Sequence, residues 1–355
     1  MLVAKDGENV IHFLVTADQI ERDGLDALQR AMSGEYDAGK VIPKYIHMTP
    51  DFQRKFREWS PAEFMMYSAT RITCMTAGEI TSYGTGFFYH SNDGEYDYFL
   101  LATNKHVLKD ADEIFFCLNI GGDEPNGGIV EYSHKLGPSQ IIGHPDPDVD
   151  LCVTNISGAI QAAMNRESPP YFAAINAKQI PSDEDWRSLD AIESVTMVGC
   201  PDGLYDETNA LAITRSGYTS SHPGKAYDGR NEFLVDIACF AGSSGSPIFR
   251  YDRGGGRWDK FTRRHVPNDN VSLLLLGILY AGPMVTIDNE GFIEIDGRAK
   301  VEIESTMHLG FAIRSSELLV VEKIFHEDSG RRRASGEQNH DNNHPPSKMR
   351  IVPAA

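Results

Sequence analysis

The sequence predicts a mainly β fold, a barrel or a sandwich, preceded by a helical N-terminal extension. From about residue 67, short apolar runs alternate with turn residues, as in Phe87–Tyr89, the Asn92-Asp93-Gly94 turn and Tyr98–Ala102. Many short strands separated by Gly, Asp and Asn are typical of all-β proteins. The first sixty residues differ, because helix-start signals there precede apolar residues at helical spacing.

These patterns divide the chain into an extension, a β domain, a connection, a second β domain and a tail: residues 1–61, 62–160, 161–194, 195–326 and 327–355. In the extension, Thr16-Ala17-Asp18-Gln19 has the capping-box pattern that starts a helix, and Ser60 begins another. The connection contains Ser168-Pro169-Pro170 and little strand pattern. The tail lacks aromatic residues and buries too little apolar surface to offset its ordering entropy, so we expect it to be disordered.

The charge balance argues against two classes of partner. With 33 basic and 51 acidic residues among 355, the formal net charge is −18. Nucleic-acid-binding proteins carry a basic footprint, and anionic membrane surfaces attract basic segments, so the sequence predicts neither partner. No apolar run approaches the roughly 20 residues that span a bilayer.

The N-terminus and the cysteines favour a cytoplasmic location. The first ten residues include Asp6 and Glu8, where a secretory signal would carry a basic and then an apolar stretch. The chain has five cysteines, which is an odd number, and no two of them form a Cys-x-x-Cys motif. We therefore expect reduced, buried thiols rather than a disulfide framework, and we expect no metal site and no cofactor.

Three motifs with chemically active residues lie on or beside the expected strands. The first is Gly84-Thr85-Gly86-Phe87-Phe88, followed by a strand that leads to His106. The second, Asp148-Val149-Asp150-Leu151-Cys152, offers two carboxylates before an apolar strand. The third is Gly242-Ser243-Ser244-Gly245-Ser246-Pro247. The order along the chain is therefore His, Asp, Ser.

In this order and spacing, the motifs resemble those of the trypsin-like serine peptidases, in the broad sense that includes chymotrypsin and the HtrA-like enzymes. Further similarities over residues 67–320 are Val198-Gly199-Cys200-Pro201, Gly277-Ile278 and Leu309-Gly310-Phe311-Ala312-Ile313. The resemblance implies two six-stranded antiparallel β-barrels, with His106 and Asp150 in the first and Ser244 in the second. Too few residues follow Val321 for the PDZ domain of many HtrA-like members, so we expect none.

The resemblance also implies a role for each site residue. A serine hydroxyl needs a base within hydrogen-bond reach, so His106 would take the proton of Ser244 and later give it to the leaving amine. Asp150 would hold the His106 tautomer and stabilise the imidazolium. The peptide N–H groups of Gly242 and Ser244 would stabilise the oxyanion. Asp148 is the alternative third member, and we prefer Asp150 because it directly precedes the apolar strand.

The sequence departs from the family pattern at three places. Ser246 replaces the second glycine after the nucleophile, and we expect this small side chain to be tolerated. Asn104 and Lys105 replace small residues before His106, with little expected effect on the triad. Ser243 replaces the aspartate that pairs with a new N-terminus in digestive enzymes, so we expect the intact chain to form its oxyanion hole without proteolytic activation.

The same resemblance places the substrate-binding strand at Tyr280, Ala281 and Gly282. The walls of the S1 pocket, which holds the side chain before the cleaved bond (P1), lie near Ala238–Ala241, Tyr280–Gly282 and Leu309–Phe311. Trypsin-type members carry a carboxylate six residues before the catalytic serine, and Ala238 occupies that position here. We therefore expect small or medium apolar P1 residues, with Asp236 as a nearby acid able to change that preference.

The leading hypothesis is an active serine endopeptidase that acts on polypeptides. The first alternative is a catalytically silent scaffold that keeps the trypsin fold and binds peptides or regulates another protein. A second alternative is an esterase-like hydrolase that uses the same three residues. Residues 1–61 either pack on the barrels or bind a regulatory protein partner, and the sequence leaves both open.

Overall fold

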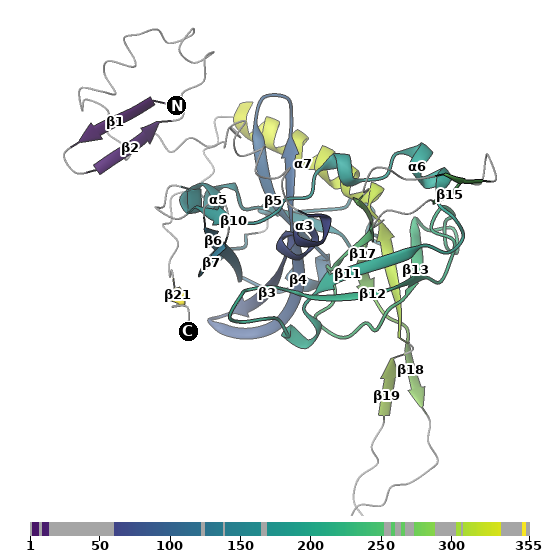
Figure 1. Ribbon diagram of the computed structural model, residues 1–355. Coiled ribbons are helices and arrows are strands. Elements are labelled where there is room, and N and C mark those ends of the chain that lie inside the picture. Colours follow the sequence, from purple (N-terminus) through teal and green to yellow (C-terminus); the bar gives the residue numbers. More distant parts are fainter. Residues whose placement is uncertain are drawn as a thin grey trace, which may run out of the picture.

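A computed structural model of the chain (Figure 1) describes residues 2–6, 9–13, 60–121, 125–137, 139–164, 169–251, 257–259, 264–266, 273–287, 303–306, 308–334 and 350–352. The predicted mainly β fold is confirmed. A large antiparallel sheet and a closed six-stranded barrel pack together, and one long helix follows the barrel.

The first β domain is a nine-stranded sheet in which seven consecutive strands come from residues 69–155: β3 (Ala69–Thr76), β4 (Glu79–Asn92), β5 (Asp97–Thr103), β6 (Glu113–Gly121), β7 (Pro125–Lys135), β8 (Ile141–Gly143) and β9 (Cys152–Asn155). Strand β10 (Pro170–Tyr171) pairs with β6, and β21 (Arg350–Val352) pairs with β7. The path of described strand pairs runs from β21 to β8, and this sheet is consistent with the double-barrel fold that the sequence predicted. Two strands from outside residues 62–160 extend the sheet.

The second β domain is a closed barrel, as predicted. Its strands follow one another around the ring as β11 (Ser194–Gly199), β12 (Ile213–Thr219), β13 (Glu232–Asp236), β20 (Leu309–Arg314), β17 (Leu273–Ala281) and β14 (Pro247–Tyr251). Two hairpins stand outside this ring: β15 (Arg257–Asp259) with β16 (Arg264–Val266), and β18 (Met284–Ile287) with β19 (Ile303–Thr306). The β18–β19 hairpin projects from the lower end of the barrel (Figure 1).

The two β domains share one apolar core. Along β4, Phe87 and Phe88 are both buried but point to opposite faces, since side chains alternate along a strand. Phe88 packs in a cluster within the first sheet, whereas Phe87 belongs to a cluster that also includes Phe249 of the barrel and Phe325 of the C-terminal helix. Adjacent residues of β4 therefore stabilise the first domain and its junction with the second.

The N-terminal extension is not entirely helical. Residues Leu2–Asp6 (β1) and Asn9–Phe13 (β2) form an antiparallel hairpin, while the helix expected from Thr16 lies outside the described residues. The helix expected at Ser60 is present as α3 (Pro61–Ser68). Ser60 accepts a hydrogen bond from the Glu63 N–H and the Glu63 carboxylate reaches back to Ser60, which is the capping box that the sequence predicted.

The connection between the domains is mostly short helices. It contains the end of α5 (Ser157–Met164), then β10, η1 (Ala177–Gln179) and α6 (Asp183–Ser188). The boundary placed at residue 160 therefore falls inside α5. A further short turn, η2 (Pro201–Gly203), follows β11 in the barrel domain.

The disorder expected from residue 327 is wrong for the part of the tail that the structure describes. Helix α7 (Ser316–Ala334) continues through residues 327–334, and residues 350–352 form β21. Leu318, Val321 and Phe325 of α7 pack in the shared core. Composition missed this helix because the polar end of α7 is held by contacts with the first β domain, the Arg333–Asp93 ion pair and the hydrogen bond from Arg332 to the Ser139 carbonyl. None of the described helices is long and apolar enough to cross a membrane.

Arg333 is the clearest of these tail contacts. Its guanidinium pairs with Asp93 at 2.9 Å, donates to the Tyr98 hydroxyl and lies over the Tyr96 ring. We expect Arg333→Ala to lower the free energy of unfolding by about 1–2 kcal/mol, because the buried Asp93 carboxylate loses a charged donor. Arg331, whose side chain is 75% exposed, is the matched control, and Arg331→Ala should change stability by less than about 0.5 kcal/mol. Urea unfolding measures both, and equal losses would contradict the proposed anchoring.

Candidate active site

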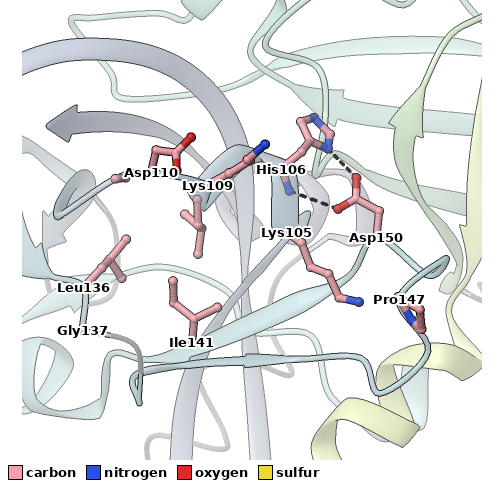
Figure 2. Close-up of a pocket in the computed structure, with 11 residues that line it drawn as sticks. Lys105, His106, Lys109, Asp110, Leu136, Gly137, Ile141, Pro147 and Asp150 are labelled. Carbon is pink, nitrogen blue, oxygen red and sulfur yellow. Dashed lines mark hydrogen bonds and ion pairs between the residues drawn. The ribbon is translucent and has the colours of Figure 1, made fainter.

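His106 and Asp150 are brought together by the pairing of β5 with β9. In this antiparallel pair Thr103 lies opposite Cys152, so the residues just after β5 and just before β9 are neighbours. His106 lies in the short helix α4 (Lys105–Leu108). Its Nδ1 is hydrogen-bonded to Asp150 Oδ2, and its peptide N–H donates to Asp150 Oδ1 at 3.0 Å (Figure 2). Both carboxylate oxygens therefore hold the same histidine.

The two candidate carboxylates differ sharply in their surroundings. Burial alone would raise the pKa of the Asp150 carboxyl, but the hydrogen bonds and charge of His106 and the N–H of Lys105 hold that pKa below its ordinary value. Asp148 is exposed, and its N–H donates to Asp146. No described hydrogen bond joins Asp148 to His106. The geometry thus places Asp150, rather than Asp148, beside the imidazole.

Asn104 contributes more than the sequence suggested. Its side chain is fully buried and donates from Nδ2 to the Asp150 carbonyl oxygen at 2.7 Å. The residue that begins α4 therefore also holds the backbone that carries the carboxylate. The available signal was an amide two residues before the histidine, where the family has a small residue. The sequence-based expectation of little effect missed this role.

A cavity of about 560 Å³ lies beside the histidine and carboxylate (Figure 2). Apolar side chains line much of it, including Leu136, Ile141 and Pro147. Lys105 and Lys109 add positive charge, and the Lys105 ammonium donates to the Asp146 carbonyl oxygen at 2.9 Å. His106, with its side chain 47% exposed, borders this cavity and is accessible to solvent.

The loop that carries Ser244 requires two glycines. Gly242 has φ +77°, and a Cβ on it would lie 2.6 Å from the Cys200 carbonyl oxygen. Gly245 has φ +88°, and a Cβ there would lie 2.0 Å from the Thr85 carbonyl oxygen. Larger residues meet both a strained backbone and a collision. The glycines allow the loop to press against β4 of the first sheet and η2 of the barrel domain.

The oxyanion-hole candidates are open. Gly242 and Ser244 are partly exposed, and their peptide N–H groups donate to no acceptor among the described residues. The Ser244 hydroxyl donates to the Tyr280 carbonyl oxygen at 3.3 Å. No hydrogen bond between this hydroxyl and His106 is present in the described part of the chain.

Thr85 connects the serine loop to the strand that leads to the histidine. Its N–H donates to the Ser244 carbonyl oxygen at 2.9 Å, and its own carbonyl oxygen accepts from the Thr103 hydroxyl at 2.7 Å. Thr103 is the last residue of β5, three positions before His106. The Ser244 loop therefore docks against the same two strands that position His106.

The segments expected to form the S1 pocket lie together. Ala281 pairs with Phe311, and a Cβ on Gly282 would approach the Leu309 carbonyl oxygen to 3.1 Å. A Cβ on Gly310 would lie 2.7 Å from the Cys239 sulfur. Cys239 is buried in this region, and burial raises the pKa of its thiol to about 11. Cys239 lies within the wall segment Ala238–Ala241 that the resemblance implied.

The polar groups near this region are already engaged. The Tyr280 hydroxyl donates to the Glu232 carboxylate at 2.7 Å. Arg215 donates to the Ala238 carbonyl oxygen at 2.8 Å and lies over the Phe240 ring. Asp236 is exposed at the end of β13.

Ser246 fits because the facing residue is glycine. The Ser246 side chain is buried, and a Cβ on Gly199 would lie 1.9 Å from its hydroxyl oxygen. The extra atoms at position 246 therefore occupy space that Gly199 leaves free, at the cost of a buried hydroxyl with no hydrogen-bond partner among the described residues.

Among the comparisons with known proteins, one gives a family match. Residues 84–255 match the model of the trypsin-like peptidase domain. A search of curated proteins finds no match. Among solved structures, a serine endoprotease from Yersinia pestis is 17% identical with a TM-score of 0.39, covering 80% of this chain and 67% of its own. The active form of the Rv3671c protease from M. tuberculosis is 14% identical with a TM-score of 0.36, covering 79% and 91%.

These structural scores are too low to support an argument of their own, so the assignment rests on the domain match. That match begins at Gly84, the first residue of the strand motif, and extends past the loop of Ser244. It also includes His106 and Asp150, which the structure joins by hydrogen bonds. Residues 84–255 of the chain therefore match the trypsin-like peptidase domain.

Proposed function

We propose that this protein is a serine endopeptidase, which cleaves polypeptides through Ser244, His106 and Asp150 by way of an acyl-enzyme. The observation that carries the proposal is the pair of unpaired peptide N–H groups at Gly242 and Ser244, beside the Ser244 hydroxyl. Buried backbone donors are rarely left without an acceptor, whereas these two partly exposed groups are open to a ligand. Two such donors facing an accessible serine fit a site for the oxyanion of a tetrahedral intermediate.

The chemistry follows from these positions. His106, held by Asp150 through Nδ1, presents Nε2 as the base that takes the Ser244 proton and returns it to the leaving amine. Before attack, the Ser244 hydroxyl exchanges its hydrogen bond with the Tyr280 carbonyl for one with His106. Catalytic hydrogen bonds of unliganded enzymes are often long or misaligned and tighten when substrate binds.

One observation favours a second function. The Ser244 hydroxyl donates to the Tyr280 carbonyl oxygen rather than to His106, which is the arrangement of a serine without its base. A catalytically silent protein that binds peptides would keep this geometry. The esterase-like alternative has no observation in its favour.

We further propose a reducing, cytoplasmic setting for this activity. The five cysteines are free in the structure, and four of them are buried. Burial raises the pKa of the Cys117 and Cys200 thiols to about 12, so neither is poised for reaction. A regulatory partner bound through residues 1–61 stays a prediction.

Removing the nucleophile or the base tests the proposed triad. We expect Ser244→Ala and His106→Ala each to lower kcat by about a million-fold, and the double variant to lose no more, because the two groups act in the same step. Peptide hydrolysis and labelling by a fluorophosphonate probe measure this on the full chain. Wild-type protein that neither hydrolyses peptides nor takes up the probe would favour the silent scaffold.

The choice between the two carboxylates has its own test. We expect Asp150→Asn to lower kcat about 10⁴-fold, because an amide holds His106 in the wrong tautomer. Asp148→Asn is the matched control, since Asp148 is exposed and has no bond to His106, and it should stay within twofold of wild type. A larger loss in the Asp148 variant would reverse the assignment.

The walls of the S1 pocket predict its preference. With Ala238 in place of a carboxylate and with Cys239, Gly282 and Gly310 packed closely, we expect cleavage after small or medium apolar residues. A peptide library read by mass spectrometry gives the P1 distribution. Asp236→Asn is the control, and it should leave the distribution unchanged. A strong preference for Arg or Lys that disappears in this variant would show that Asp236 serves the pocket.

A further inference from the structure

We propose that Thr85 is a positioning residue for the oxyanion hole, acting from the first β domain on a loop of the second. The inference rests on the proposed function, because it concerns how the two N–H donors of Gly242 and Ser244 are oriented. Thr85 is the second residue of the Gly84-Thr85-Gly86-Phe87-Phe88 motif and is completely buried. It therefore contacts no substrate.

The direction of both hydrogen bonds at the Thr85 hydroxyl is determined. The Cys200 N–H can only donate, and it lies 2.9 Å from Thr85 Oγ1, so the oxygen accepts there. The one hydroxyl proton is then given to the Gly242 carbonyl oxygen, also at 2.9 Å. A buried hydroxyl with one donor and one acceptor satisfied has a single orientation.

This hydroxyl holds one end of the peptide group between Gly242 and Ser243. The other end is held as well, because the Ser243 N–H donates to the Phe240 carbonyl oxygen at 3.0 Å. In a trans peptide the C=O and N–H point in opposite directions, so two such bonds set the plane of the group. Thr85 thus fixes the peptide that lies between the two oxyanion donors.

The backbone of Thr85 fixes the next carbonyl in the same way. Its N–H donates to the Ser244 carbonyl oxygen, and the Gly245 N–H of that same peptide group donates to the Leu279 carbonyl oxygen at 2.8 Å. Thr85 therefore contributes one bond from its backbone and one from its side chain, to two carbonyl groups two residues apart.

The peptide groups that carry the donors are held at their carbonyl ends only. The Ala241 carbonyl accepts from the Asp202 N–H at 2.6 Å, and the Ser243 carbonyl accepts from the Ser246 N–H at 3.1 Å. Their N–H ends, at Gly242 and Ser244, are left free for a ligand. A rotation of the intervening Gly242–Ser243 group changes ψ of Gly242 and φ of Ser243, and wherever these two changes do not cancel, the angle between the two N–H groups changes as well.

Gly242 makes that rotation easy unless something opposes it. A glycine at positive φ has the widest choice of backbone conformations, so the loop itself does not enforce its geometry. Ser243 carries no charge that could hold the loop through an ion pair. The buried Thr85 hydroxyl supplies a neutral restraint.

The test compares Thr85→Val with Thr85→Ser in the full chain. Valine keeps the shape and removes the hydroxyl, whereas serine keeps the hydroxyl. We expect Thr85→Val to lower kcat by about 10–100-fold with KM changed less than threefold, a smaller loss than that of a whole oxyanion donor, about 10²–10³-fold. Thr85→Ser should stay within about threefold of wild type. The substrate is a chromogenic peptide amide with an apolar P1 residue.

A matched control separates positioning from stability. Thr154 is also fully buried, and its hydroxyl is hydrogen-bonded to His134 at 2.9 Å in the first sheet, away from the Ser244 loop. Thr154→Val should lose stability on urea unfolding while keeping kcat within twofold. If Thr85→Val keeps its kcat, or if Thr154→Val loses as much kcat as Thr85→Val, the inference is overturned.

A crystal structure of Thr85→Val keeps the inference testable without turnover. We expect the Gly242 carbonyl to rotate away from position 85, and an unchanged Gly242–Ser243 peptide would overturn the inference. An inactive wild-type enzyme would count against the proposed function alone. An active wild type with an equally active Thr85→Val variant would count against Thr85 alone.

Discussion

The hydrogen bond from the Thr85 N–H to the Ser244 carbonyl joins the two β domains where the chemistry is proposed to take place. The position of the serine loop relative to His106 depends on this contact. It requires β4 to lie against the serine loop. That closeness in turn requires glycine at position 245, because a Cβ there would collide with the Thr85 carbonyl. The Thr103 hydroxyl bonds the same carbonyl, so the strand before His106 is tied to the same place.

Helix α7 holds the second β domain against the first at another point. Glu317, near its start, forms a buried pair with His144 at 2.9 Å and accepts from Asn231 of the barrel domain. The His144 N–H donates to the Leu151 carbonyl, directly after Asp150. The loop that carries the carboxylate is therefore bounded by α7 on one side and by Asn104 on the other. A buried pair of this kind is weak evidence for stability and better evidence for a specific arrangement.

The site combines tightly held groups with free ones. The carbonyls of residues 241–244 each accept a hydrogen bond, whereas the N–H groups of Gly242 and Ser244 have no partner in the described part of the chain. This contrast is expected where a backbone must stabilise charge that develops only during a reaction, because donors that are already oriented do not have to reorganise. The same need explains why the loop has φ values of +77° and +88° at its two glycines, where other residues would be strained.

The sequence by itself determined the mainly β fold, the capping box at Ser60 and the order of the three motifs, because these depend on neighbours along the chain. The pairing of His106 with Asp150 could be expected from the sequence, because their motifs lie beside β5 and β9, and these two strands pair in the structure. Tertiary structure alone decided the roles of Thr85 and Asn104, since their partners Gly242 and Asp150 are distant in sequence. It also decided that residues 327–334 are helical, although their composition predicted disorder. Arg333 in this segment contacts Asp93 and the Tyr96 ring, which lie between β4 and β5. No local sequence pattern encodes such contacts.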